Sequence, residues 1–146
     1  MTDHVVYVDA KSKARDLEEI IEGSRTMIIR GAAGRKLPYG KVFAGDVLYL
    51  IRNNAEGLVR AKCSVKFVLN SEKMDKETST KLVEKHQEKL HLTPKQFDRW
   101  AGKRYLCLIE IENVEKIVPF VLNKANYPNT DDWIPCEDIE NVRKES

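Results

Sequence analysis

The chain has 146 residues, of which 42% are hydrophobic and 33% are charged. These values are typical of a soluble globular protein and exclude a largely disordered chain. No apolar run approaches the roughly 18 to 20 residues that span a bilayer, and the polar beginning Met1-Thr-Asp-His is unlike a signal peptide. We therefore predict a single domain over residues 1–146, located in the cytoplasm and not associated with a membrane.

Charge is distributed unevenly along the chain, although the formal net charge is only +2. Residues 24–66 contain nine basic and two acidic side chains, whereas residues 109–146 contain nine acidic and four basic ones. The first of these segments is suited to a polyanionic partner, and the second is not.

The cysteines and histidines form no recognisable metal site. Cys63, Cys107 and Cys136 are far apart and lack a Cys-x-x-Cys pair, so we expect reduced packing residues. His86 and His91 are five residues apart, which places them about 140° apart around a helix. No phosphate-binding loop, dinucleotide fingerprint or nucleophile elbow is present, and we expect no cofactor.

The first third of the chain predicts a strand, a helix and a second strand. Residues 5–8 are rich in β-formers, and residues 9–12 offer capping side chains for a helix whose apolar positions recur at helical spacing. Gly23 is placed to end this helix in a left-handed conformation. Residues 26–30 are rich in β-branched side chains and predict a buried strand with Arg25 and Arg30 near its ends.

The middle of the chain predicts two more strands. A glycine-rich loop over residues 31–43 precedes a Gly-Asp turn, a strand at 47–52 and a turn at 53–57. Residues 58–69 alternate between apolar and polar side chains, with one face predicted to be buried and the other basic. The buried face would comprise Val59, Ala61, Cys63, Val65 and Phe67, and the opposite face would carry Arg60, Lys62, Ser64 and Lys66.

The remainder predicts helices followed by strands. Residues 78–87 suit a helix with Leu82, Val83 and His86 inward, and Thr93-Pro94 predicts the start of a short helix that ends before Gly102. Strands are expected at 105–111 and 117–122, a turn-rich segment around 127–135, and a polar helix at 137–144. This order favours an α+β fold around a curved or closed sheet rather than a doubly wound parallel sheet.

Three short segments together resemble a known family. They are Gly23 to Arg30, Ala44-Gly-Asp-Val-Leu48, and Glu84-Lys-His86 followed by Thr93. Their order and spacing resemble the ASCH family of the PUA-like superfamily, and within it the small bacterial acetylcytidine amidohydrolases. The resemblance covers roughly residues 17–112 and implies a PUA-like mixed β-pseudobarrel with flanking helices. The residues from about 113 onward would form an extension beyond the small enzymes.

The catalytic residues of those amidohydrolases are replaced in this sequence. The resemblance places Arg25 at the family's lysine, Ile28 at its second threonine and Leu90 at its glutamate. Arginine stays protonated and cannot act as a general base, and neither isoleucine nor leucine supplies a reactive group. Glu88 would replace the glutamate only if its helix shifted register. We therefore expect this reaction to be absent, while other enzymatic activity is left open.

Related domains are known or proposed to bind RNA, so the resemblance implies a cleft for RNA or a nucleotide-like ligand. The residues expected to line it are Gly23, Arg25, Thr26, Arg30, Arg35, Lys36, Tyr39 and Lys41. The cations would contact phosphate, Thr26 would offer a hydroxyl, and Tyr39 would stack on a base.

Each of these assignments has a structural alternative. Arg25 and Arg30 could instead form ion pairs with the acidic C-terminal segment, Tyr39 could pack on Pro38, and the basic face of residues 58–69 could simply be solvated. Trp100 and Trp133 are expected in the core, with a cleft position for Trp133 as the alternative.

Two other functions remain open from the sequence. One is a hydrolase that acts on a modified nucleoside or RNA with a rearranged site. The other is a protein-interaction module whose basic face meets an acidic partner. The oligomeric state does not follow from the sequence.

Overall fold

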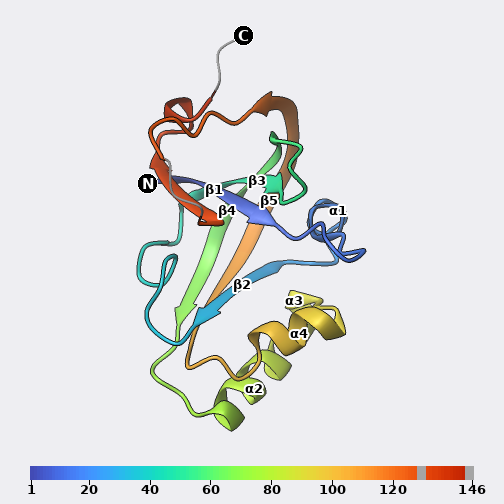
Figure 1. The fold of residues 1–146 in the computed structure, drawn as a ribbon, viewed down its shortest axis with the longest axis vertical. Coiled ribbons are helices and arrows are strands. Elements are labelled where there is room, and N and C mark those ends of the chain that lie inside the picture. The colour runs from blue at the N-terminus through green and yellow to red at the C-terminus, as the bar shows by residue number, and fades with distance from the viewer. Residues whose placement is uncertain (128–130, 144–146) are drawn as a thin grey trace.

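A computed structural model describes residues 1–127 and 131–143, and a curled sheet of six strands organises it (Figure 1). The strands are β1 (Asp3–Val8), β2 (Met27–Ala32), β3 (Val47–Arg52), β4 (Leu58–Asn70), β5 (Tyr105–Val121) and β6 (Trp133–Glu137). Their order in the sheet is β2-β5-β4-β3-β1-β6. Strands β1 and β3 are parallel and every other neighbouring pair is antiparallel. The sheet and its helices confirm the predicted α+β pseudobarrel.

Within residues 1–127 and 131–143, four α-helices accompany the sheet: α1 (Asp16–Glu22), α2 (Lys76–Lys85), α3 (Gln87–Leu90) and α4 (Pro94–Trp100). They lie on the side of β2, while the long β2–β3 loop lies across the sheet from them (Figure 1). A short 3-10 helix, η1 (Ile139–Asn141), follows β6. In the part of the chain that the structure describes, no helix is long and apolar enough to cross a membrane.

Local sequence signals explain where several helices begin and end. Gly23 follows α1 with φ of 90°, a left-handed conformation that glycine adopts without strain, and its N–H bonds to the carbonyls of Glu19 and Ile20. Thr93 caps α4 in a reciprocal capping box with Gln96. Both of these boundaries confirm the prediction. The predicted cap for α1 was wrong, because Arg15 occupies the N-cap position without a side-chain hydrogen bond.

The alternation in β4 holds over most of its length and fails at one point. Val59, Ala61, Cys63 and Val65 are buried as predicted, but Phe67 is half-exposed. The pairing of β4 with β5 shifts register between Val65 and Phe67, and such a bulge changes the face on which later side chains lie. Burial of Phe67 was therefore a wrong prediction.

The C-terminal third differs most from expectation. The strands predicted at 105–111 and 117–122 are one continuous strand, β5. The segment predicted to be turn-rich contributes β6, an edge strand in which Pro135 is tolerated. Where a helix was predicted over residues 137–144, the structure contains only η1. Residue 144 of that prediction and residues 128–130 of the turn-rich segment lie outside the described residues.

Gly31 allows β2 to approach β5 closely. A Cβ there would lie 2.7 Å from Leu106 Cδ2 and 3.1 Å from the Tyr105 carbonyl oxygen. We expect Gly31→Ala to lower the free energy of unfolding by about 1–3 kcal/mol, because the buried Leu106 side chain and the neighbouring Tyr105 carbonyl would have to move aside. Chemical denaturation would measure this.

Gly34→Ala is the matched control, since nothing lies within 4 Å of a Cβ at that position. It should change stability by no more than about 0.5 kcal/mol. Equal stability of the two variants would show that the β2–β5 contact tolerates a methyl group.

Candidate functional site

Two adjoining cavities lie between the end of β2, α4 and the segment before β6. The first has a volume of about 400 Å³ and the second about 440 Å³. Both are lined by Arg30, Arg99, Trp100, Asp131 and Asp132. We call the two together the cleft, and Arg30 lies where they meet.

The two cavities differ in their other lining residues. The first is also lined by Tyr7, Val8, Asp9, Lys11, Asp16, Ile20, Arg25, Ile28, Ile29, Asn53, Leu92, Gln96 and Lys124. The second is also lined by Gly31, Lys36, Leu37 and Lys103. The first cavity thus combines an apolar wall with nearly balanced charge, five bases against four acids, whereas bases outnumber acids four to two in the second.

Arg30 is held from several sides at the junction of the cavities. Its two terminal nitrogens donate to the carbonyls of Ile29 at 2.8 Å and Tyr7 at 2.7 Å. Its guanidinium carbon lies 5.9 Å from the ring centre of Trp100 and 5.7 Å from that of Trp133. Nε lies 3.1 Å from a carboxylate oxygen of Asp132, without the alignment of a hydrogen bond. The predicted alternative of an ion pair with the C-terminal segment is thus observed for Arg30.

Burial lowers the pKa of Arg30, and the nearby Asp132 carboxylate acts in the opposite direction. A partly desolvated cation of this kind is stabilised by an anion in contact with it. Asp132 supplies that anion from a position that is itself about half exposed.

Arg25 lines the first cavity but is committed to a buried polar network. Its Nη2 donates to Glu19 at 2.9 Å, to the His91 carbonyl at 2.9 Å and to Gln96 at 3.2 Å. It also lies 3.2 Å from Asp16. The partners of Arg25 therefore come from α1, α4 and the end of α3, and the ion pair with the C-terminal segment proposed for it was wrong.

Gln96 connects this network to a second carboxylate. Its Nε2 donates to Asp9 and to Asp16, at 3.0 Å in each case. Burial raises the pKa of Asp16, and the opposing effects of Arg25 and Gln96 are smaller. For Glu19, burial also acts to raise the pKa, but hydrogen bonds from Arg25 and His91 outweigh it and the pKa is lowered.

The positions that correspond to the amidohydrolase catalytic groups carry packing residues. Ile28 is buried and contributes an apolar part of the first cavity. Leu90 is fully buried in a cluster with Met27, Ile29 and Val83. Glu88, the considered substitute, is exposed and does not line either cavity.

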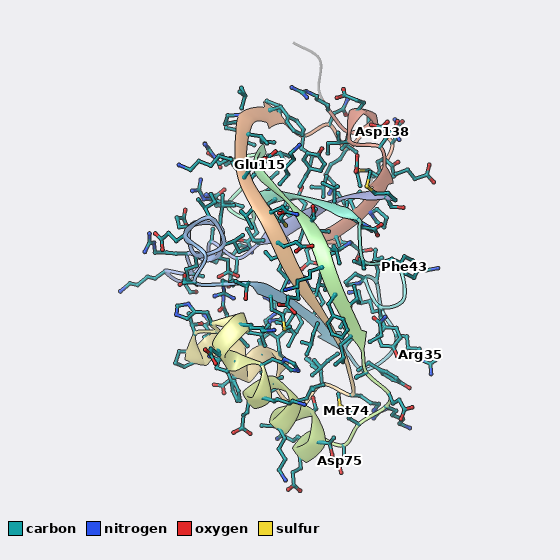
Figure 2. The ribbon with its side chains drawn as sticks, turned by 180° about the vertical axis from the view of Figure 1, so that it is seen from behind. Arg35, Phe43, Met74, Asp75, Glu115 and Asp138 are labelled. Atoms are coloured by element: carbon teal, nitrogen blue, oxygen red, sulfur yellow. The ribbon has the colours of Figure 1, made fainter. Side chains whose placement is uncertain are left out.

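The glycine-rich loop divides its basic residues between different surroundings. Lys36 lines the second cavity. Arg35 instead packs against two aromatic rings, with its guanidinium carbon 6.0 Å from the ring centre of Tyr39 and 5.6 Å from that of Tyr105. Figure 2 shows Arg35 and Phe43 at the edge of the molecule opposite the helices. Lys41 is exposed and does not line the cleft. Lys36 therefore lines the same cavity as Arg30, whereas Arg35 and Lys41 line neither cavity of the cleft.

The remaining predicted site residues have backbone or packing contacts. The Tyr39 hydroxyl donates to the Ser71 carbonyl, and its ring meets Tyr105 edge to face. The Thr26 amide donates to the Lys89 carbonyl, and the Thr26 carbonyl accepts from the Ile111 amide. Gly23 lies at the end of α1, and neither Gly23, Thr26 nor Tyr39 lines the cleft.

The basic face of β4 differs electrostatically from the cleft. Arg60 pairs with Glu56, Lys62 with Glu115 at 3.2 Å, and Lys66 with Glu110 at 3.9 Å. Within the described residues, Lys36, Arg99 and Lys103 have no carboxylate within ion-pair distance. Among the described residues, these three cleft cations therefore lack the ion pairs that neutralise the basic face of β4.

Sequence reasoning missed Arg99, Lys103, Asp9 and Asp16 as cleft residues. Arg99 and Lys103 lie at the end of α4 and just after it, about 70 residues from Arg30 in the sequence. The capping box at Thr93, which fixes the start of α4, and Gly102, which has a positive φ just after it, gave a usable signal, because the bases Arg99 and Lys103 lie close to Gly102 in the sequence. Trp100 was predicted to pack in the core. It packs against the apolar cluster that contains Leu90, and it also lines the cleft.

Trp133 is fully buried in a network that includes two other polar residues. Its Nε1 donates to His4 Nδ1 at 3.1 Å, and His4 Nε2 bonds to Asp46 at 2.9 Å. Burial acts to raise the pKa of Asp46, but the bonds from His4 and from the Thr2 and Phe43 amides lower it overall. The core position of Trp133 confirms the prediction.

Comparison with known proteins identifies the fold. No protein-family model and no curated protein sequence matches this chain. The structure is similar to crystal structures of ASCH from Zymomonas mobilis. One point mutant matches with a TM-score of 0.70 and 14% identity over 96% of this chain and 94% of the other. A second structure matches with a TM-score of 0.65 and 14% identity over 92% and 87%.

The N-terminal domain of Staphylothermus marinus McrB is also similar, with a TM-score of 0.54 and 12% identity over 96% of this chain and 92% of that domain. At these identities the comparisons concern the fold. The chain has an ASCH, PUA-like fold, as the resemblance predicted.

Proposed function

We propose that the protein binds RNA or a nucleotide in the cleft. The observation that carries this proposal is the convergence of Lys36, Arg99 and Lys103 on the second cavity beside Arg30. Cations of this kind attract phosphate, and their contacts with single-stranded RNA release counterions and make binding depend on salt. The fold shared with ASCH proteins supports the same class of ligand.

The proposal concerns binding rather than amide hydrolysis. Arg25, Ile28 and Leu90 supply no general base, hydroxyl or carboxylate at the three positions used by the amidohydrolases. Arg25 is engaged through Nε and Nη2 by two carboxylates, an amide and a carbonyl. Neither the hydrolase alternative nor the protein-interaction alternative is favoured by a feature of the cleft.

The proposal is tested by charge neutralisation at the cleft. Binding of a fluorescent single-stranded RNA is measured at several salt concentrations with wild type and with the triple variant Lys36→Ala, Arg99→Ala, Lys103→Ala. We expect the slope of log affinity against log salt to become shallower by about two, at roughly 0.7 per lost phosphate contact.

The matched control is Arg60→Ala, Lys62→Ala, Lys66→Ala, which removes three charges that are already paired. It should bind RNA with nearly the wild-type slope. The proposal fails if folded wild type binds neither single-stranded nor structured RNA at low salt, or if the control loses as much affinity as the cleft variant.

A further inference from the structure

The two cavities of the cleft suit chemically different parts of one ligand. The second cavity combines Lys36, Arg99 and Lys103 and favours an anion. The first also contains the carboxylates of Asp9 and Asp16, whose oxygens accept hydrogen bonds and favour a donor on the ligand. The cavities join at Arg30, so a single ligand can reach both.

Asp16 retains hydrogen-bonding capacity at the wall of the first cavity. Its Oδ1 receives Gln96 at 3.0 Å and lies 3.2 Å from Arg25. Its Oδ2 has no hydrogen-bond partner among residues 1–127 and 131–143, although the side chain is only 14% exposed. A carboxylate accepts about four hydrogen bonds, so a donor on a ligand would complete its coordination.

The surroundings of Asp16 fix its position and limit its solvation. Gln96 also holds Asp9, whose other oxygen accepts from the Lys11 amide at 3.0 Å. Ile20, Ile28 and Leu92 supply an apolar wall beside these groups. A volume of about 400 Å³ is within the range of cavities that accept small ligands.

We infer that the first cavity binds a nucleobase carrying an exocyclic amino group, which donates to Asp16 or Asp9 while the attached phosphate lies in the second cavity. The inference rests on the proposed function and specifies its ligand. A carbonyl oxygen in place of the amino group would face a carboxylate and lose the hydrogen bond. Sites built around a specific hydrogen bond discriminate strongly against ligands that lack it.

The experiment compares two matched pairs of ligands in which a carbonyl oxygen replaces the amino group and the neighbouring ring nitrogen gains a proton. Wild-type protein is titrated with single-stranded oligomers of cytidine and of uridine, and with oligomers of adenosine and of inosine. We expect at least one amino-bearing member to bind about tenfold more tightly than its carbonyl counterpart. The salt slope should be the same within a pair, because the phosphates are unchanged.

Asp16→Asn and Asp9→Asn test whether the carboxylates cause the discrimination. An amide offers both a donor and an acceptor, so the variant at the responsible carboxylate should reduce the difference within the pair to about twofold or less. Glu19→Gln is the control, because Glu19 belongs to the same network but does not line the cleft. It should keep the wild-type discrimination.

The outcomes separate this inference from the proposed function. Equal binding within both pairs overturns the inference and leaves RNA binding intact. Failure of all four oligomers to bind overturns both. If both Asp variants still bound the amino-bearing oligomers more tightly than their carbonyl counterparts, the assignment of Asp16 and Asp9 would also be overturned. The wild-type titrations come first and test the inference even if a variant does not fold.

Discussion

Replacing Arg25 by leucine is expected to lower the free energy of unfolding by about 3–5 kcal/mol. The substitution would leave the carboxylates of Asp16 and Glu19 without their shared cation, and it would remove donors from Gln96 and the His91 carbonyl. Breaking a buried ion pair from one side is costly because the remaining charge stays desolvated. Chemical denaturation monitored by tryptophan fluorescence would measure the loss.

Arg15→Ala is the control for Arg25→Leu. Arg15 lies 3.8 Å from Glu22 with both side chains more than half exposed, and such pairs contribute little. We expect a change of no more than about 0.5 kcal/mol. Similar losses for the two variants would show that the Arg25 network does not stabilise the fold.

The effect of Arg25→Leu should also depend on pH. The folded protein lowers the pKa of Glu19. The ionised Glu19 therefore stabilises the fold at neutral pH, and this stabilisation is lost as the pH falls through the pKa of Glu19 in the folded protein. The difference in stability between wild type and Arg25→Leu should therefore shrink on acidification. A difference that grew in acid would contradict this assignment.

At the Arg30–Asp132 ion pair, the two single variants should change RNA affinity in opposite directions. Arg30→Met removes the cation at the junction of the cavities and should weaken binding about tenfold or more, the range of a lost hydrogen bond to a charged group. Asp132→Asn removes a carboxylate that competes for Arg30 and repels phosphate, and should strengthen binding by about two- to fivefold. Fluorescence anisotropy at low salt would resolve both changes.

Asp138→Asn provides a control with the same loss of charge. Asp138 lies near η1, at the end of the molecule away from α2 (Figure 2). Its side chain accepts a hydrogen bond from the Glu140 amide, which asparagine can replace. Weaker binding by Asp132→Asn would mean that Asp132 chiefly positions Arg30. An equal gain in Asp138→Asn would mean that overall charge explains the effect.

Sequence signals were informative where structure depends on near neighbours. Gly23 and Thr93-Pro94 specify helix ends through backbone geometry and capping, and both were predicted. The period-two pattern predicted β4 because burial on one face acts directly on alternate residues. It failed at Phe67 because the bulge depends on how β5 pairs with β4, which the strand's own sequence does not contain.

The cleft was predicted less completely than the fold for a related reason. Arg30 and Lys36 were identified from a basic segment, but Arg99 and Lys103 meet them only after α4 packs against β2. Arg25 shows the opposite effect. A basic residue beside a basic loop suggested ligand contact, whereas three residues of α1 and α4 bind it within the fold.

The buried contact between Trp133 and His4 also has a consequence for the order in which the protein folds. These residues are 129 positions apart, and β6 pairs with β1 after every other strand has been synthesised. Contacts of such large sequence separation close late, because the intervening chain must first lose its freedom. Asp132 and Trp133 reach Arg30 with this strand, so a nascent chain on the ribosome should acquire most of its sheet before it acquires a complete cleft.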